Sequence, residues 1–91
     1  MNPDQTIAEI SKVFGIDTRV KIIRLLKDKP LCVGALARRL DITPGAVSQH
    51  LRILKAARLV VPQKKGYFVH YSLDEETFRK WKKEINKLLD V

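Results

Sequence analysis

Apolar residues recur every three or four positions through the first half of the chain, which is the spacing of a helix with one buried face. The spacing predicts a first helix over residues 4–14, ended by Gly15. A second helix is expected to begin at Asp17 or Thr18, since both residue types cap helix N-termini, and to end before Pro30. Its apolar face is wide, so it should be buried on more than one side.

Two further short helices are expected close together in the middle of the chain. Their apolar stripes place them over residues 33–40 and 44–57, with only residues 41–43 between them. Thr43 is suited to cap the second of these helices, and Pro44 to occupy its first position. A short connection into a well-capped helix is typical of a helix-turn-helix.

After Leu59 the helical spacing gives way to alternation, which predicts a β-hairpin. Apolar and aromatic residues occupy every second position from Tyr67 to Leu73, following a turn built on Gly66 and the lysine before it. Pro62 is expected to make the preceding strand short or irregular, because proline cannot donate to the ladder of hydrogen bonds.

A last helix is predicted over residues 75–89, with Asp74 as its N-cap. The order of elements is then α-α-α-α-β-β-α, which is mainly α with a small β-hairpin. A helix-turn-helix followed at once by a basic hairpin predicts a winged helix-turn-helix. Residues 1–91 should form a single domain, because so short a chain builds only one modest core.

Basic residues are concentrated in the middle of the chain. The net charge is +8, but residues 43–73 hold five Lys or Arg, both histidines and no Asp or Glu, whereas residues 74–91 hold five residues of each sign. A concentrated basic face favours a polyanionic partner such as nucleic acid. The alternative is that the charge only keeps a small domain soluble.

The polar residues near the start of helix 44–57 suit contact with DNA bases. The second helix of a helix-turn-helix enters the major groove with its N-terminal residues at the base edges. Small residues allow close approach, and Ser48 and Gln49 can hydrogen-bond to bases, while cations bind phosphates. The alternative is an ordinary solvated helix face. We expect base readout by Pro44, Gly45, Ala46, Ser48 and Gln49, and backbone or wing contacts by Thr43, His50, Arg52, Lys55, Arg58, Lys64, Lys65 and Tyr67.

The stretch ALARRLDITPGAVSQHLRILKAARLVVPQKKGYFVHYSL resembles the ArsR-type winged-helix transcriptional regulators of bacteria and archaea. The resemblance covers about residues 16–74. It implies a homodimer whose first and last helices pair across a two-fold axis, and repression by binding an inverted repeat in duplex DNA. The features that carry it are Leu-Ala-x-x-Leu at residues 36–40, Val47-Ser48-x-His50-Leu51, and Gly66-x-x-Val69-x-Tyr71-Ser72-Leu73.

The first and last helices favour a dimer by their own pattern as well. Their apolar faces are larger than a chain of 91 residues readily hides. The alternative is that these faces close the core of a single chain. Two recognition helices related by a dyad would read half-sites about one DNA turn apart. The expected interface residues are Ile7, Ile10, Phe14, Phe78, Trp81, Ile85 and Leu88.

The residues at the usual metal positions of this family are mostly not ligands. A cysteine pair at the start of the third helix is one family site, but here Cys32 is followed by Val33 and Gly34. The two histidines have no ligand-spaced partner. We therefore predict no metal site and no cofactor. At the last-helix positions that match a second family site only Glu75 is a ligand type, beside Thr77, Leu88 and Val91.

Cys32 leaves a redox alternative open. A thiol near a helix N-terminus can have raised reactivity, although a buried cysteine commonly serves as a small apolar side chain. The sequence identifies no small-molecule effector, and one is compatible with the family.

Other classes of function are disfavoured. The chain has no Gly-rich phosphate loop and no nucleophile-base set that can be placed together, so we expect no enzyme. No apolar run approaches the roughly 18 residues of a membrane span, so we expect no membrane partner and a cytoplasmic location. The remaining alternative is a winged helix that serves protein interaction or non-specific nucleic-acid binding.

Overall fold

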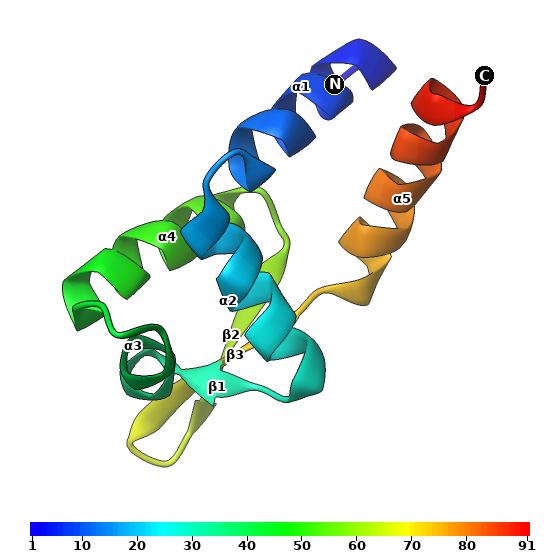
Figure 1. Cartoon of the computed structure of the whole chain (residues 1–91). Helices are drawn as coiled ribbons and strands as arrows, with labels where there is room; N and C mark the ends of the chain where they lie inside the picture. The colour runs from blue at the N-terminus through cyan, green and yellow to red at the C-terminus, as the bar shows by residue number, and fades with distance from the viewer.

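The computed structural model describes all residues from Met1 to Val91, folded as five helices and a three-stranded sheet (Figure 1). The predicted order of helices and hairpin is confirmed, and one short strand is added before the third helix. The elements are α1 (Pro3–Phe14), α2 (Asp17–Asp28), β1 (Leu31–Cys32), α3 (Val33–Leu40), α4 (Pro44–Ala56), β2 (Val60–Lys65), β3 (Phe68–Leu73) and α5 (Glu75–Leu89).

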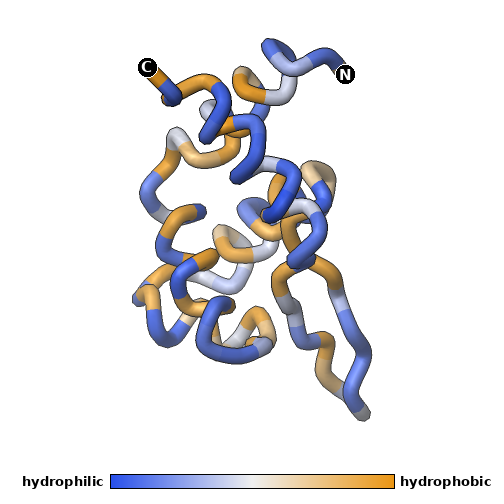
Figure 2. Tube along the Cα trace, turned by 90° about the vertical axis from the view of Figure 1, so that its right-hand side faces the viewer, coloured by the Kyte–Doolittle hydropathy of each residue, from blue (hydrophilic) through white to orange (hydrophobic).

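The molecule is elongated, with extents of 45 × 23 × 22 Å. Both termini lie at one end, where α1 and α5 run beside each other, and the helix-turn-helix and the hairpin occupy the other end (Figure 1). Turned by 90°, the hairpin extends away from the helical body (Figure 2). The two ends of the molecule are therefore free for two different interactions.

The sheet is antiparallel with the strand order β1-β3-β2. The sequence did not predict β1, because two residues are too few to show alternation. The expectation of a short or irregular first hairpin strand was wrong: β2 pairs with β3 over six residues, with Pro62 opposite Tyr71. Since β2 is an edge strand, its proline can turn its missing donor away from the ladder.

A single hydrophobic core holds α2, α3, α4 and the base of the hairpin together. Helix α4 contributes Val47, Leu51 and Leu54, each at most 2% exposed. These three side chains lie four and three residues apart, so they form one buried stripe. The other core residues exposed by less than 2% are Ile22, Leu36 and Leu59.

The ends of the first two helices differ in part from the prediction. Asn2 caps α1 through a reciprocal pair of hydrogen bonds with Gln5. Gly15 does end α1, and a side chain there would lie only 2.9 Å from the Ser11 carbonyl oxygen. The expectation that Asp17 or the following threonine caps α2 was wrong, because Ile16 is the N-cap and makes no side-chain hydrogen bond. The Asp17 carboxylate instead lies in the first turn, where the helix dipole favours it.

Arg19 ties α1 to α2. It is buried, at 5% exposed, and no other charged residue is. Its Nε donates to the Val13 carbonyl oxygen at 2.7 Å, and its Nη2 donates to that of Lys12 at 2.9 Å. Both carbonyls belong to the last turn of α1, where no helical donor is available. One guanidinium therefore caps α1 and fixes its position on the body.

We predict that Arg19→Met lowers the free energy of unfolding by about 2 kcal/mol, because hydrogen bonds from a charged donor contribute about 1.5–3 kcal/mol. Urea unfolding at one fixed protein concentration measures this difference. Arg24→Met, at an exposed position of the same helix, is the matched control and should change stability by less than about 0.5 kcal/mol. Equal effects of the two substitutions would contradict the role assigned to Arg19.

Candidate nucleic-acid interface

The N-terminus of α4 is built by its cap. The Thr43 hydroxyl oxygen accepts a hydrogen bond from the Ala46 amide at 3.1 Å, and Pro44 occupies the first helical position. Both predictions for this helix start are confirmed. The turn before it bends at Asp41, whose backbone adopts a left-handed conformation with φ of 54°. Because aspartate tolerates this conformation better than most residues, the chain can reverse sharply between α3 and α4.

The buried stripe of α4 determines which of its side chains face solvent. Ser48, Gln49, Arg52 and Lys55 are all exposed, on the sides of the helix away from the core. With Gly45, these residues recur at spacings of three and four, so they form a continuous polar and basic stripe. The structure thus brings together the predicted base-reading and phosphate-binding positions of this helix on one accessible surface.

His50 differs from these neighbours because it is only partly exposed. Its Nδ1 is buried and has no hydrogen-bond partner, and the same is true of His70 in β3. A DNA contact by His50 would therefore have to use its other ring nitrogen, Nε2.

The hairpin carries two lysines and an aromatic tip. Lys64 and Lys65 are exposed at the end of β2, as the sequence predicted. The two-residue loop consists of Gly66, with φ of 63°, and Tyr67, which is fully exposed. A positive φ at the first loop position favours glycine in hairpins of this length. Phe68, 61% exposed beside the loop, was missed by sequence reasoning, although the alternation placed it opposite the core side.

Two arginines of α3 extend the basic surface and were not among the predicted site residues. Arg38 and Arg39 are exposed in the last turn of α3, directly before the turn into α4. The first helix of a helix-turn-helix crosses the DNA backbone, so their place in the motif was the signal that could have found them.

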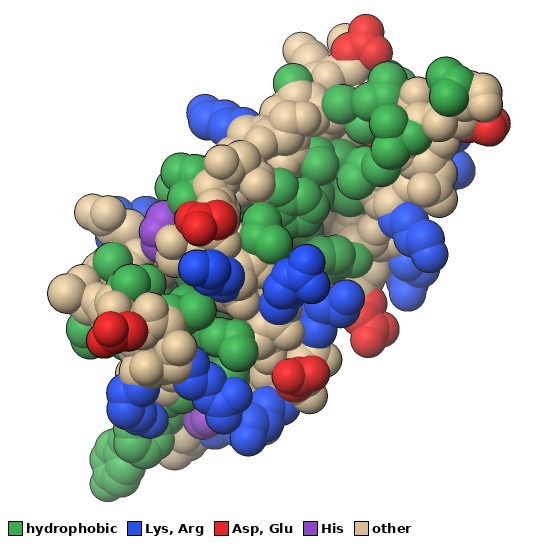
Figure 3. Space-filling view, in the orientation of Figure 1, with side chains coloured by type: hydrophobic (Ala, Val, Ile, Leu, Met, Phe, Trp, Pro, Cys, Tyr) green, Lys and Arg blue, Asp and Glu red, His purple; other side chains and the backbone are tan.

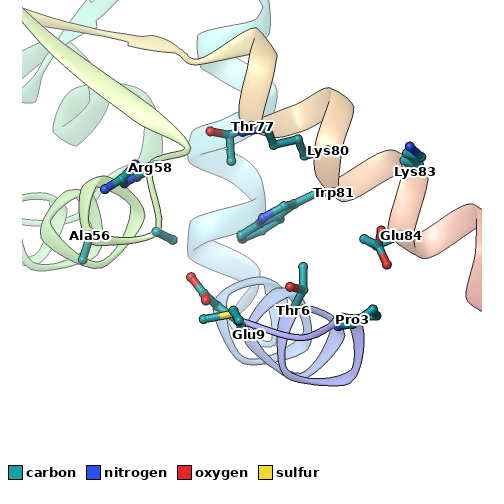
Figure 4. Close-up of a pocket in the computed structure, with 12 residues that line it drawn as sticks. Pro3, Thr6, Glu9, Ala56, Arg58, Thr77, Lys80, Trp81, Lys83 and Glu84 are labelled. Atoms are coloured by element: carbon teal, nitrogen blue, oxygen red, sulfur yellow. The ribbon is translucent and has the colours of Figure 1, made fainter.

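Arg58 lies away from this surface, although the sequence placed it with the phosphate contacts. It lines a hollow between the end of α4, α1 and α5, where Glu9 and Trp81 also lie (Figure 4). Its backbone has φ of 63°, directly after the C-cap of α4. We therefore leave Arg58 out of the candidate interface.

The predicted dimer helices pack first against each other. The rings of Phe14 and Trp81 lie edge to face with centroids 5.4 Å apart, and Ile10 and Trp81 are at most 7% exposed. Part of the apolar surface thus closes the core of one chain, while Leu88 stays 59% exposed. The other predicted interface residues, each partly exposed, are Ile7, Phe78 and Ile85.

No three His, Cys, Asp or Glu side chains gather closely enough to hold a metal ion. Cys32 is a free, partly exposed thiol, opposite His70 in the β1–β3 pairing. None of the helices has the length and apolar character needed to cross a membrane.

Known proteins share both the sequence pattern and the fold. The sequence model that describes the family "bacterial regulatory protein, arsR family" matches residues 17–61 of this chain. The chain is 37% identical over 65 residues to the transcriptional repressor SdpR of Bacillus subtilis (strain 168). The aligned region covers 71% of this chain and 72% of that protein.

Solved structures agree with this result. A possible transcriptional regulator for arsenical resistance superposes with a TM-score of 0.77 and 32% identity, over 85% of this chain and 80% of that one. The homodimeric winged helix-turn-helix DNA-binding domain of a possible ArsR-family regulator from Mycobacterium bovis gives a TM-score of 0.75 over 94% of this chain and 80% of that one. At 23% identity, the latter shows the fold alone.

Fold, basic surface and comparisons together define a winged helix-turn-helix DNA-binding protein. The chain belongs to the ArsR family of bacterial regulatory proteins and is a transcriptional regulator, not an enzyme. The family resemblance found in the sequence is thereby confirmed.

Proposed function

We propose that this protein is a transcriptional repressor that binds an inverted repeat in duplex DNA as a homodimer. The observation that carries the proposal is the exposed polar and basic stripe of α4 together with the exposed lysines of the hairpin, in a stretch that lacks any acidic residue over positions 43–73. The polyanionic backbone of DNA is the partner that such a surface fits best.

Base reading would fall to the first two turns of α4. Gly45 and Ala46 have little side chain and would let the helix backbone approach the floor of the major groove. The Gln49 amide can pair with the N6 and N7 edge of adenine, while the Ser48 hydroxyl can donate or accept. Val47, the residue before Ser48, is buried, and its burial fixes which side of this turn faces away from the core.

Phosphate contacts would orient this helix and supply most of the affinity. Arg52 and Lys55 follow the base-reading residues along the exposed stripe, and Arg39 flanks them from α3. Lys64 and Lys65 would reach the adjacent backbone or minor groove from the wing. The fully exposed hydroxyl of Tyr67 is also suited to donate to a phosphate.

The dimer would form at the end of the molecule that carries both termini (Figure 1). Leu88 and Leu89 expose 59% and 67% of their surface there, at the end of α5. Ile7 of α1 and Ile85 of α5 are partly buried. The related domain from Mycobacterium bovis is homodimeric. A dyad at this end would point two copies of α4 at successive turns of the same DNA face.

Repression would follow from occupancy. A dimer that covers two half-sites excludes other proteins from that stretch of duplex. The relative SdpR is named a repressor, which supports repression as the effect of binding.

We predict different losses for Gln49→Ala and Lys65→Ala on a duplex enriched from a random pool at moderate salt. Gln49→Ala should weaken the enriched site by about 1–3 kcal/mol, roughly 5- to 150-fold, and leave random duplex almost unchanged. Lys65→Ala should weaken both duplexes equally and lower the slope of log affinity against log salt by about one. Fluorescence anisotropy over a salt series measures the affinity of each variant for each duplex, and the slope against salt.

Lys87→Ala, at an exposed position of α5, is the matched control and should change neither affinity nor slope. Failure to enrich any sequence, with affinity that fades smoothly as salt rises, would contradict the repressor proposal. That outcome would favour a non-specific nucleic-acid or protein-interaction module.

We predict that Leu88→Asp raises the dissociation constant of the dimer by about 100-fold or more, because burial of a leucine contributes about 1.5–3 kcal/mol and the dyad doubles each change. Sedimentation equilibrium of the full chain gives this constant. Tyr67→Asp places the same charge on a fully exposed aromatic position of the hairpin and should leave the dimer unchanged. A dimer that is insensitive to Leu88→Asp would place the interface elsewhere.

A further inference from the structure

A second concave site lies between the C-terminal end of α2, the end of β3 and the start of α5. The hollow has a volume of about 710 Å³, within the range of pockets that hold small organic ligands. Its lining comes from α2, β3, α5 and the segment after α2, with no residue of α4. In Figure 1 the N-terminal half of α4 lies at the opposite edge of the molecule from α5. The hollow is therefore separate from the proposed DNA surface.

The floor of this hollow is apolar. Ile23 and Leu26 from α2 lie there beside Leu73 from β3 and Phe78 from α5. Leu73 and Phe78 are only partly buried, so a ligand placed against them would remove apolar surface from water. Phe78 thus contributes to this hollow as well as to the apolar face of α5.

The rim is basic. Lys27 and Lys29 come from the end of α2, and Arg79 and Lys82 from α5. All four are exposed, and none of them takes part in an ion pair, whereas other lysines of the same two helices, such as Lys21 and Lys87, do. Two carboxylates, from Asp28 and Glu75, also line the hollow and leave its rim with two net positive charges. Lys and Arg side chains gather over this region in Figure 3.

An apolar floor under an unpaired basic rim fits one class of ligand. We propose that this hollow binds a small amphipathic carboxylic acid, with its hydrocarbon body on Phe78 and Leu73 and its carboxylate between Lys29 and Arg79. A guanidinium offers two parallel donors to a carboxylate, so Arg79 is the cation best suited to orient it. A neutral ligand of the same size would make the apolar contacts with the floor but would lack the ionic contacts with the rim.

The position of the hollow connects a ligand to DNA binding, an extension that rests on the proposed function. The ligand would touch α2, which packs on α4, together with the last residues of the wing strand β3 and the first turns of α5. A change in the angle between α5 and α2 would alter the separation of the two α4 helices in a dimer. By linkage, the factor by which the ligand changes operator affinity equals the factor by which the operator changes ligand affinity.

The direct test uses the full chain without DNA. Sodium octanoate and its uncharged analogue octanamide are titrated into the ¹⁵N-labelled protein, and amide shifts give the site and the dissociation constants. We expect shifts concentrated around Lys27, Lys29, Leu73 and Arg79, with octanoate bound at least ten-fold more tightly than octanamide. Shifts that are absent, or that follow every surface lysine alike, would overturn the site.

Two double variants distinguish a specific effect of the rim cations from an effect of the net charge of the protein. Lys29→Gln with Arg79→Gln should weaken octanoate at least ten-fold and leave octanamide unchanged. The control, Lys21→Gln with Lys87→Gln, removes the same charge from α2 and α5 outside the hollow and should leave octanoate affinity unchanged. An equal loss in both double variants would contradict a specific carboxylate site.

The coupling between the hollow and DNA binding is tested by a separate measurement, the affinity for DNA with and without octanoate. Octanoate should change the affinity for the enriched duplex at least three-fold in the unsubstituted protein and not in the Lys29→Gln, Arg79→Gln variant. Octanoate binding with no change in DNA affinity would overturn the coupling and leave the site standing. If no duplex is enriched at all, the repressor proposal fails while the shift experiment still decides the site.

Discussion

The packing of one side of α4 on the core sets what its other side can do. Val47, Leu51 and Leu54 are 0%, 2% and 0% exposed, so the helix cannot turn about its axis without exposing them. A shift by one residue, about 100°, would bring a polar side chain into the core and remove a buried aliphatic one, whose burial contributes roughly 1.5–3 kcal/mol. The polar residues between them are therefore presented to a partner by the same contacts that stabilise the domain.

The rest of the fold extends this constraint along the molecule. The Thr43 cap ends the turn at a defined point, so the small residues of the first turn lie at the tip of the helix. At the other end, the Arg19 guanidinium fixes α1 on α2, and the Phe14 and Trp81 rings join α1 to α5. Helices α1 and α5 are thus attached firmly to the body that carries α4. A dimer that binds two half-sites requires such an attachment, because it must hold its two copies of α4 at a fixed distance. The basic hollow lies where α5 leaves that body, so a small ligand bound there would touch both parts.

Local signals explain what the sequence could predict. The helix-turn-helix, the Thr43 cap, the Asp74 cap and the hairpin each depend on residues close together in the chain, and all four are present. Strand β1 could not be predicted, because its two residues become a strand only by pairing with Tyr71 and His70. The full length of β2 depends on its place at the sheet edge, and the role of Arg19 depends on the end of another helix. Among the site residues, the accessible stripe of α4 followed from periodicity, whereas the separate position of Arg58 followed only from the course of the chain after α4.

The most direct test of the account is a hydroxyl-radical footprint of the 91-residue chain on its enriched duplex. Two copies of α4 held by a dyad should protect two patches on one face of the DNA, centred about 10 base pairs apart. The pattern should be symmetric about the centre of the inverted repeat. A single protected patch, or protection spread evenly along the duplex, would contradict a dimer that reads two half-sites with α4.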